Sequence, residues 1–204
     1  MPETALTREQ ILEAAEVVLR RFGPAKATVV DVARALGVSH GSVYRHFASK
    51  AALRDAVAER WLARVSTPLA EIALAEGPAE ERLRRWLDTL IALKHAKVLD
   101  DPELFATYGE LAADARDVIA AHVDALADQL AKIVTDGVAE DTFVVSDPAA
   151  AGRAILDATA RFHNPAHAAE WADPKIATAF EHVWTLLRAG LGARQVAAPG
   201  LSAA

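Results

Sequence analysis

The densest group of side chains that could do chemistry in this chain lies between residues 39 and 50. It combines hydrogen-bond donors with small residues: Ser39, His40, Gly41, Ser42, Tyr44, Arg45, His46 and Lys50. Arg and His can donate hydrogen bonds to guanine, Ser can bond several bases or a phosphate, and Gly allows a helix to approach closely. The pattern predicts contact with the major groove of double-stranded DNA.

Two short helices joined by a glycine turn are expected to position these side chains. Thr28 is a helix-capping residue type, and Asp31 three residues later completes a capping box. Gly37 then allows the chain to leave the helix in a left-handed conformation. Ser39 can cap the second helix, whose apolar Val43 and Phe47 should turn inward. The first helix has its own buried stripe of Val29, Val32, Ala33 and Leu36. Residues 28–47 therefore predict a helix-turn-helix.

Charge favours DNA as the partner of this motif. Short helix pairs with a glycine turn are also common in all-helical proteins, so the motif alone leaves a purely structural role open. The chain as a whole has a net charge of -6, but residues 1–64 contain 10 Lys/Arg and 7 Asp/Glu, whereas residues 65–204 contain 12 and 21. Phosphate contact needs only local positive charge. A mildly basic N-terminal domain joined to an acidic remainder fits DNA binding.

Composition limits the class of protein. The 204 residues are 52% hydrophobic and 25% charged, which is typical of a globular protein with one or two domains. No apolar run approaches the roughly 18 residues that a membrane span needs, so no membrane partner is expected. Cysteine is absent and the N-terminus lacks a signal pattern. A cytoplasmic protein is therefore expected.

The periodicity predicts an all-α fold. A first helix should begin at the capping box Thr7–Gln10 and end at Gly23-Pro24, and a fourth should begin at Ser49-Lys50 and stop near Pro68. Asp-Pro pairs mark several later helix starts. Further helices are expected over 69–76, 79–98, 102–113, 115–136, 147–162 and 174–191. The strand-like Thr142–Val145 is expected to be a loop, and 196–204 a frayed tail.

The order of these elements resembles the N-terminal domain of the TetR family of bacterial transcriptional regulators. The resemblance covers about residues 4–64 and lies in the capped first helix, the block Thr-x-x-Asp-Val-Ala-x-x-Leu-Gly-Val-Ser-x-Gly-Ser-Val-Tyr-x-His-Phe and the following Ser-Lys-x-x-Leu. It implies an all-helical homodimer with an N-terminal DNA-binding domain. Residues 65–195 would then form a divergent ligand-binding and dimerisation domain.

Carried over residue by residue, the resemblance implies phosphate or backbone contacts for Thr28, Tyr44 and Lys50. It makes His40, Ser42 and Arg45 the candidate base readers. The sequence departs mildly from the family at His40, where members often carry a small or basic residue, and at Ala51-Ala52, where an acidic residue often follows the lysine. Two alternatives stay open: Tyr44 as a half-buried core ring, and His46 as a structural residue beside Phe47.

The last two predicted helices are the candidate dimer interface. One face carries small and the other large apolar residues: Ala149, Gly152, Leu156, Phe180, Val183, Trp184 and Leu187. Such faces interdigitate in a four-helix bundle. The alternative is an ordinary core within one chain. A symmetric dimer would place its recognition helices about 34–36 Å apart, one turn of DNA, and so match a palindromic operator.

An effector pocket is expected among the middle helices. Its candidate lining is mostly apolar and aromatic: Trp86, Leu90, Phe105, Tyr108, Ile119, His122 and Phe162. A helix-bundle core needs similar stripes, so plain core packing is the alternative for each. The composition favours a small, mainly apolar effector.

Neither a metal site nor a catalytic site is expected. His163 and His167 are four residues apart, but Pro165 interrupts the helix that would align them, and no suitable acidic ligand is near. No nucleophile motif or phosphate loop is present, so no cofactor is predicted. The sequence thus favours a ligand-responsive regulator, a repressor that a small effector releases from its operator. The alternatives are a constitutive architectural DNA-binding protein and a helical enzyme.

Overall fold

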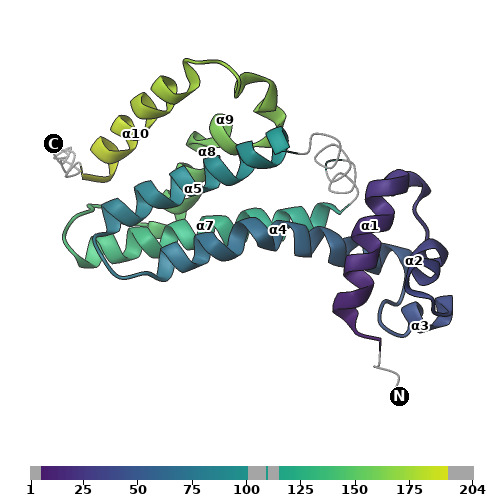
Figure 1. Cartoon of the computed structure of the whole chain (residues 1–204). Helices are drawn as coiled ribbons and strands as arrows, with labels where there is room; N and C mark the ends of the chain where they lie inside the picture. Colours follow the sequence, from purple (N-terminus) through teal and green to yellow (C-terminus); the bar gives the residue numbers. More distant parts are fainter. Residues whose placement is uncertain (1–5, 101–108, 110–114, 193–204) are drawn as a thin grey trace, which may run out of the picture. The chain divides into compact units, whose positions relative to one another are not determined.

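A computed structural model describes residues 6–100, 109 and 115–192. Within these ranges the regular structure is helical and contains no strand, so the predicted all-α class is confirmed (Figure 1). The elements are α1 (Arg8–Lys26), α2 (Val29–Leu36), α3 (His40–Tyr44), α4 (Lys50–Leu74), α5 (Ala79–Asp100), α7 (Arg116–Ala139), α8 (Pro148–Ala158), α9 (Ala160–His163), the 3-10 helix η1 (Pro165–Glu170) and α10 (Ile176–Gly192).

Local capping explains why most of these helices begin where the sequence predicts. Thr7 caps α1 and Thr28 caps α2, each in a complete capping box. Gly23 has a φ of 72°, which breaks the regular helix at the expected end of α1, although the chain resumes helical geometry as far as Lys26. Residues 142–145 form a loop, as expected.

One predicted helix end and one predicted continuous helix are wrong. α4 passes through Pro68 and continues to Leu74, and so includes the separate helix expected over 69–76. Proline removes one hydrogen bond from a helix interior, but Leu69 and Ala73 are buried beyond it and hold the last turns in place. The helix expected over 147–162 is divided at Thr159 into α8 and α9. The helix expected over 102–113 and the tail 196–204 lie outside the described residues.

The chain forms two compact units. The first unit comprises residues 1–67 and 96–123, and the second unit comprises residues 68–95 and 124–204. These units interleave in sequence, so the division into 4–64 and 65–195 remains a proposal about where the two functions lie.

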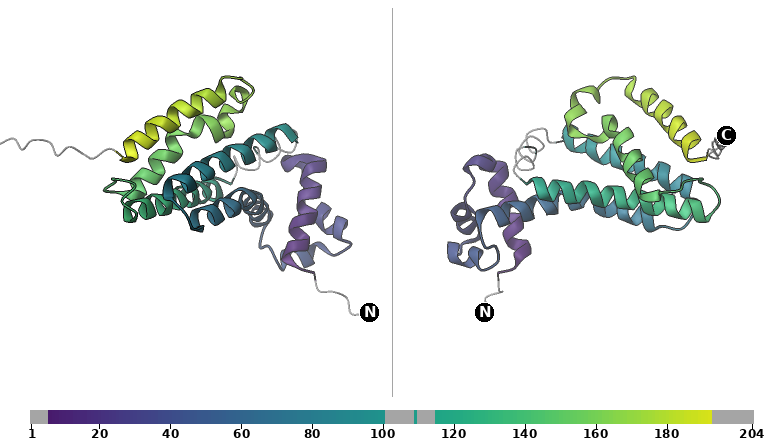
Figure 2. Two further views of the ribbon diagram at one scale, coloured as in Figure 1. Left: turned by 60° about the vertical axis from the view of Figure 1, so that its left-hand side comes forward. Right: turned by 180° about the vertical axis from the view of Figure 1, so that it is seen from behind.

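The first unit is built on α1, α2, α3 and the beginning of α4. Figure 2 shows α1, α2 and α3 side by side from two further directions. Their apolar faces share one core with Ala115 from the chain just before α7, against which Val118 and Ile119 also pack. The core includes Ile11, Ala15, Val29, Val32, Ala33, Val43, Phe47, Leu53, Val57 and Trp61. The helix-turn-helix therefore rests on a continuous apolar support.

The second unit buries a core of its own, with fully buried Leu83, Trp86 and Leu90 on α5 and Leu130 and Ile133 on α7. α10 is joined to α5 by ion pairs at its exposed edge. Arg84 Nη2 lies 2.6 Å from Glu181 Oε1, and Arg188 Nε lies 2.6 Å from Glu80 Oε1.

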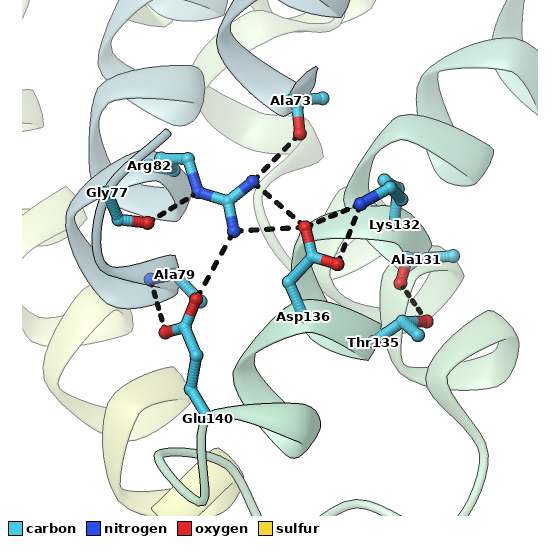
Figure 3. Close-up of polar contacts among 9 residues, drawn as sticks. All are labelled: Ala73, Gly77, Ala79, Arg82, Ala131, Lys132, Thr135, Asp136 and Glu140. Carbon is cyan, nitrogen blue, oxygen red and sulfur yellow. Dashed lines mark hydrogen bonds and ion pairs between the residues drawn. The ribbon is translucent and has the colours of Figure 1, made fainter. Parts of the chain in front are cut away.

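A buried arginine ties three elements of the second unit together (Figure 3). Arg82 donates to the Ala73 carbonyl at the end of α4, to the Gly77 carbonyl in the following turn, and to Asp136 Oδ2 on α7. Glu140 lies 3.6 Å from the same guanidinium and accepts a hydrogen bond from the Ala79 amide. The end of α4 is thus fixed to α5 and α7 through a single side chain.

Candidate nucleic-acid interface

The start of α2 and the turn after it have the geometry that the sequence predicts. Thr28 Oγ1 donates to Asp31 Oδ2 at 2.6 Å and accepts from the Asp31 amide at 3.2 Å. The hydrogen bond from Thr28 is the main reason why the pKa of the Asp31 carboxyl is lowered. Gly37 adopts a left-handed conformation with a φ of 69°, and its amide bonds back to the Ala33 and Arg34 carbonyls. The turn is therefore fixed before any DNA is present.

The second helix of the motif, α3, turns its polar side chains away from the core. Val43 and Phe47 are buried, whereas four residues are exposed and two are half-buried. The exposed ones are His40, Gly41, Tyr44 and Arg45, and the half-buried ones are Ser42 and His46. The structure thus brings the predicted base-reading residues onto α3 and its C-terminal cap, where His40 and Arg45 are exposed and Ser42 is half-buried.

Hydrogen bonds connect three side chains of α3 and its cap. Ser39 caps the helix by accepting from the Ser42 amide at 3.2 Å. The Ser39 and Ser42 hydroxyls lie 3.0 Å apart, and Arg45 Nη2 donates to Ser42 Oγ at 3.1 Å. The rings of His40 and Tyr44 form a separate edge-on contact, with 6.3 Å between their centroids.

Tyr44 is 44% exposed, so part of the residue is open to solvent. His46 is half-buried next to the buried Phe47. This placement agrees with the alternative in which His46 is a structural residue. Neither exposure decides the role of its residue, so both stay predictions.

Thr28 and Lys50 lie at the edge of the same hollow. Lys50 is the exposed first residue of α4. Both residues line an apolar cavity of about 30 Å³ whose walls come from α1, α2 and α4 and include Ala15, Leu19 and Val57. Thr28 and Lys50, at the N-terminal ends of α2 and α4, therefore line the same cavity. Both are expected to contact the DNA backbone.

Arg8 belongs beside this surface and was missed by the sequence reasoning. Its guanidinium carbon lies 4.3 Å from the centroid of the Phe47 ring, and Nη1 donates to the His46 carbonyl at 3.4 Å. Arg8 therefore joins the start of α1 to the residues that follow α3. The contact spans 38 positions in sequence, so no local spacing indicates it.

The described residues expected to line an effector pocket belong to both units of the chain, and a common pocket stays a prediction. Trp86, Leu90 and Phe162 are buried in the second unit, while Ile119 packs on the core of the first unit. His122 also belongs to the first unit, and Phe105 and Tyr108 lie outside the described residues. Trp86 Nε1 donates to Gln129 Oε1 at 3.0 Å, which satisfies the buried indole.

The residues expected at the dimer interface are also divided. Gly152, Leu156, Phe180 and Trp184 are buried inside this chain, and a Cβ at Gly152 would lie 2.5 Å from the Ala131 amide nitrogen. Gly152 packs on α7, Phe180 lies against Phe162 of α9, and Arg84 of α5 lies over the rings of Phe180 and Trp184. These contacts are of the kind that the alternative, a core within one chain, predicts, and the dimer interface stays a prediction. Ala149 is exposed, Val183 and Leu187 are half-buried, and Leu186 beside them is 73% exposed.

The two histidines examined for metal binding have separate partners. His163 is buried, with Nε2 3.3 Å from both Thr159 Oγ1 and the Leu156 carbonyl. His167 Nδ1 lies 2.8 Å from Glu170 Oε1. Burial lowers the pKa of His163 to about 4. Among the described residues no cluster of three or more His, Cys, Asp or Glu side chains could hold a metal ion.

Comparison with known proteins decides the family. Residues 11–57 match the family described as bacterial regulatory proteins, tetR family, and residues 79–184 match the tetracyclin repressor-like C-terminal domain. The chain belongs to the TetR family. The description of the N-terminal match as bacterial regulatory proteins agrees with the helix-turn-helix that the sequence predicts.

Individual relatives agree with this assignment. The transcriptional regulator TtgR of Pseudomonas putida is 44% identical over 55 residues, which is 27% of this chain and 26% of that protein. The chain thus matches only about a quarter of the length of this curated relative. None of the described helices is both long enough and apolar enough to cross a membrane.

Solved structures show the same fold. SmeT, the repressor of a Stenotrophomonas maltophilia multidrug efflux pump, has a TM-score of 0.65 at 20% identity over 96% of this chain and 95% of that one. SmeT is also known in a triclosan complex. FadR from Bacillus subtilis, solved with stearoyl-CoA, has a TM-score of 0.60 at 18% identity, covering 90% of this chain and 99% of that one.

Proposed function

We propose that this TetR-family protein is a repressor that binds a palindromic operator as a homodimer and is released by a small, mainly apolar effector. The observation that carries the DNA-binding part is the outward face of α3, where Arg45, His40 and Tyr44 are exposed on a helix held by capped turns. A cytoplasmic location follows from the proposal, because a bacterial chromosome lies in the cytoplasm.

Two kinds of DNA contact are proposed. Thr28, Tyr44 and Lys50 would contact phosphates, which fix the position of a protein on the duplex and carry no direct sequence information. Arg45 and His40 would read base edges in the major groove, where an arginine can donate two hydrogen bonds to guanine. Gly41 would allow α3 to approach the bases closely, and Ser39 and His46 would support the ends of the helix.

The proposed dimer uses the outer surface of α8 and α10. Ala149, Val183 and Leu187 remain candidates. Leu186 joins them because it is 73% exposed and shares one side of α10 with Val183 and Leu187, so that the three side chains form an apolar patch. Gly152, Leu156, Phe180 and Trp184 would instead support this surface from within the chain. Two-fold symmetry would then present two α3 helices to successive major grooves.

The proposed effector binds in the C-terminal region. The complexes of SmeT with triclosan and of FadR with stearoyl-CoA support an apolar ligand for a protein of this fold. Trp86, Leu90 and Phe162 are candidate wall residues from the described part of the chain, and Phe105, Tyr108, Ile119 and His122 stay candidates from the sequence. Binding would shift α4 between two states, and moving a population from 99% in one state to 99% in the other requires about 5.5 kcal/mol of differential affinity.

The division between backbone and base contacts can be tested by substitution. We expect Tyr44→Phe and Lys50→Ala to weaken binding to all DNA sequences alike, and Lys50→Ala to reduce the slope of log affinity against log salt by about 1. Arg45→Ala should instead relax the preference at particular base pairs. Affinities for an operator and for random duplexes, measured at several salt concentrations, would separate the two classes. Equal losses for all three variants on every duplex would contradict the proposal.

A further inference from the structure

Ser42 was expected to read a base, but its hydroxyl is engaged within the helix. A serine hydroxyl has one donor and two acceptor positions. Ser42 Oγ accepts from Arg45 Nη2 at 3.1 Å and shares a hydrogen bond with Ser39 Oγ at 3.0 Å. Two of its three hydrogen-bonding positions are therefore used before DNA arrives, and the side chain is half-buried whereas Arg45 is exposed.

Arg45 keeps enough donors to recognise a base pair. A guanidinium has five N–H groups in a rigid planar fork. The bond to Ser42 uses one of them, so four remain, including a pair that can meet O6 and N7 of guanine. The bond to Ser42 thus orients the plane of the fork without blocking it.

We propose that Ser42 is a positioning residue, whose hydroxyl, held by the Ser39 cap, orients the Arg45 guanidinium for base recognition. A free arginine on a surface loses rotamer freedom when it docks, and this loss weakens binding. A guanidinium already held in place loses less rotamer freedom on binding. Because the guanidinium is planar, the resulting gain in affinity is specific to a base pair that can accept its two parallel hydrogen bonds. The inference deepens the proposed function and depends on it.

The test is a map of base preference for the full-length chain. Binding sites are first selected from random DNA, and affinities are then measured for the operator and for each single-base variant of it. Arg45→Ala should lower the discrimination about tenfold at one base pair in each half-site. Ser42→Ala should lower the discrimination about threefold at the same base pair, and should have no further effect there in the Arg45→Ala background.

Two control variants separate positioning from general damage to the helix. Ser42→Thr keeps the hydroxyl and should retain the discrimination at the Arg45 base pair. His40 is the other proposed base reader, so His40→Ala should alter the discrimination at another base pair and leave that at the Arg45 base pair unchanged.

Several results would overturn the inference. They are a change at a different base pair in Ser42→Ala, equal effects of Ser42→Thr and Ser42→Ala, or additive effects of Ser42→Ala and Arg45→Ala. If the unaltered protein shows no preference at any position, the proposed function itself fails. A clear consensus with a Ser42 effect elsewhere would remove only the positioning role.

Discussion

Gly41 lies on an exposed helix face, where alanine would make the folded state more stable. Its backbone does not adopt the left-handed conformation that favours glycine, and an added Cβ would meet only Ser39 Oγ at 3.7 Å, an ordinary contact. Since glycine loses more conformational freedom on folding than alanine, its presence on α3 fits a requirement for close approach to DNA.

We therefore expect Gly41→Ala to raise the free energy of unfolding by roughly 0.5 kcal/mol and to weaken operator binding. Urea unfolding and an operator titration would measure the two effects. Gly37→Ala is the matched control, because its φ of 69° is unfavourable for other residues and substitution should cost roughly 1–2 kcal/mol. Unchanged operator affinity in stable Gly41→Ala protein would show that α3 does not approach DNA at this position.

The polar residues that could be predicted best from sequence are those that bond locally. The caps at Thr7, Thr28 and Ser39 each use atoms within three residues, so residue type and spacing suffice to place them. Arg8 could not be predicted, because its contact with Phe47 depends on how α1 packs against the end of α3.

At the scale of elements, the packing of α8 depends on a residue without a side chain. Gly152 lies against the backbone of Ala127 and Ala131 on α7, where an added Cβ would come within 2.9 Å of three backbone atoms. Because backbone cannot turn aside as a flexible side chain can, the two helices would have to separate.

Gly152→Ala should therefore lower the free energy of unfolding by about 1–3 kcal/mol. Gly190→Ala on α10 is the control, since nothing lies within 4 Å of its added Cβ, and it should be neutral or stabilising by up to about 1 kcal/mol. Thermal or urea denaturation of both variants would decide. Equal stability of the two would mean that α7 and α8 are not packed as described.

The Arg82 cluster makes a second prediction about elements. Burial by itself would raise the pKa of Asp136, but hydrogen bonds from Lys132 and Arg82 lower it below its usual range. Replacing Arg82 would leave the Ala73 and Gly77 carbonyls without this donor and Asp136 with Lys132 alone, so Arg82→Met should destabilise the chain by about 2–3 kcal/mol. Lys132→Ala, which removes an exposed partner of the same carboxylate, should cost at most about 1 kcal/mol. Urea unfolding would show whether the two differ as predicted.

Helix boundaries away from caps were harder to predict than caps. Pro68 indicated a helix end, but burial of Leu69 and Ala73 outweighs the single hydrogen bond that proline removes. Nothing local marked the break at Thr159, whose hydroxyl donates to the Ile155 carbonyl. The burial of Phe180 and Trp184 on α10 likewise depends on tertiary packing, so the sequence alone left both a dimer surface and a core within one chain open for them.

At the scale of the whole molecule, folding should depend on the protonation of His163. Burial lowers its pKa from 6.5 to about 4, and the neighbouring Lys94 charge acts in the same direction while Asp157 opposes it. As pH falls through 6.5, His163 binds a proton in the unfolded chain, whereas in the folded chain it binds one only near pH 4. Stability present above pH 6.5 is therefore lost over this window, by about 3 kcal/mol in all.

Urea unfolding between pH 7.5 and 4 would measure this loss. His163→Gln should show a decrease smaller by about 3 kcal/mol than that of the unaltered protein. An identical pH dependence in His163→Gln would mean that His163 is not buried in its neutral form.

The most direct test of the account is the selection of binding sites from random double-stranded DNA by the unaltered full-length chain. We predict a palindromic consensus whose half-sites lie about 10–10.5 base pairs apart, or a multiple of that distance, centre to centre, as two recognition helices in successive major grooves require. A pool that binds without any consensus would contradict it and would favour a constitutive architectural protein.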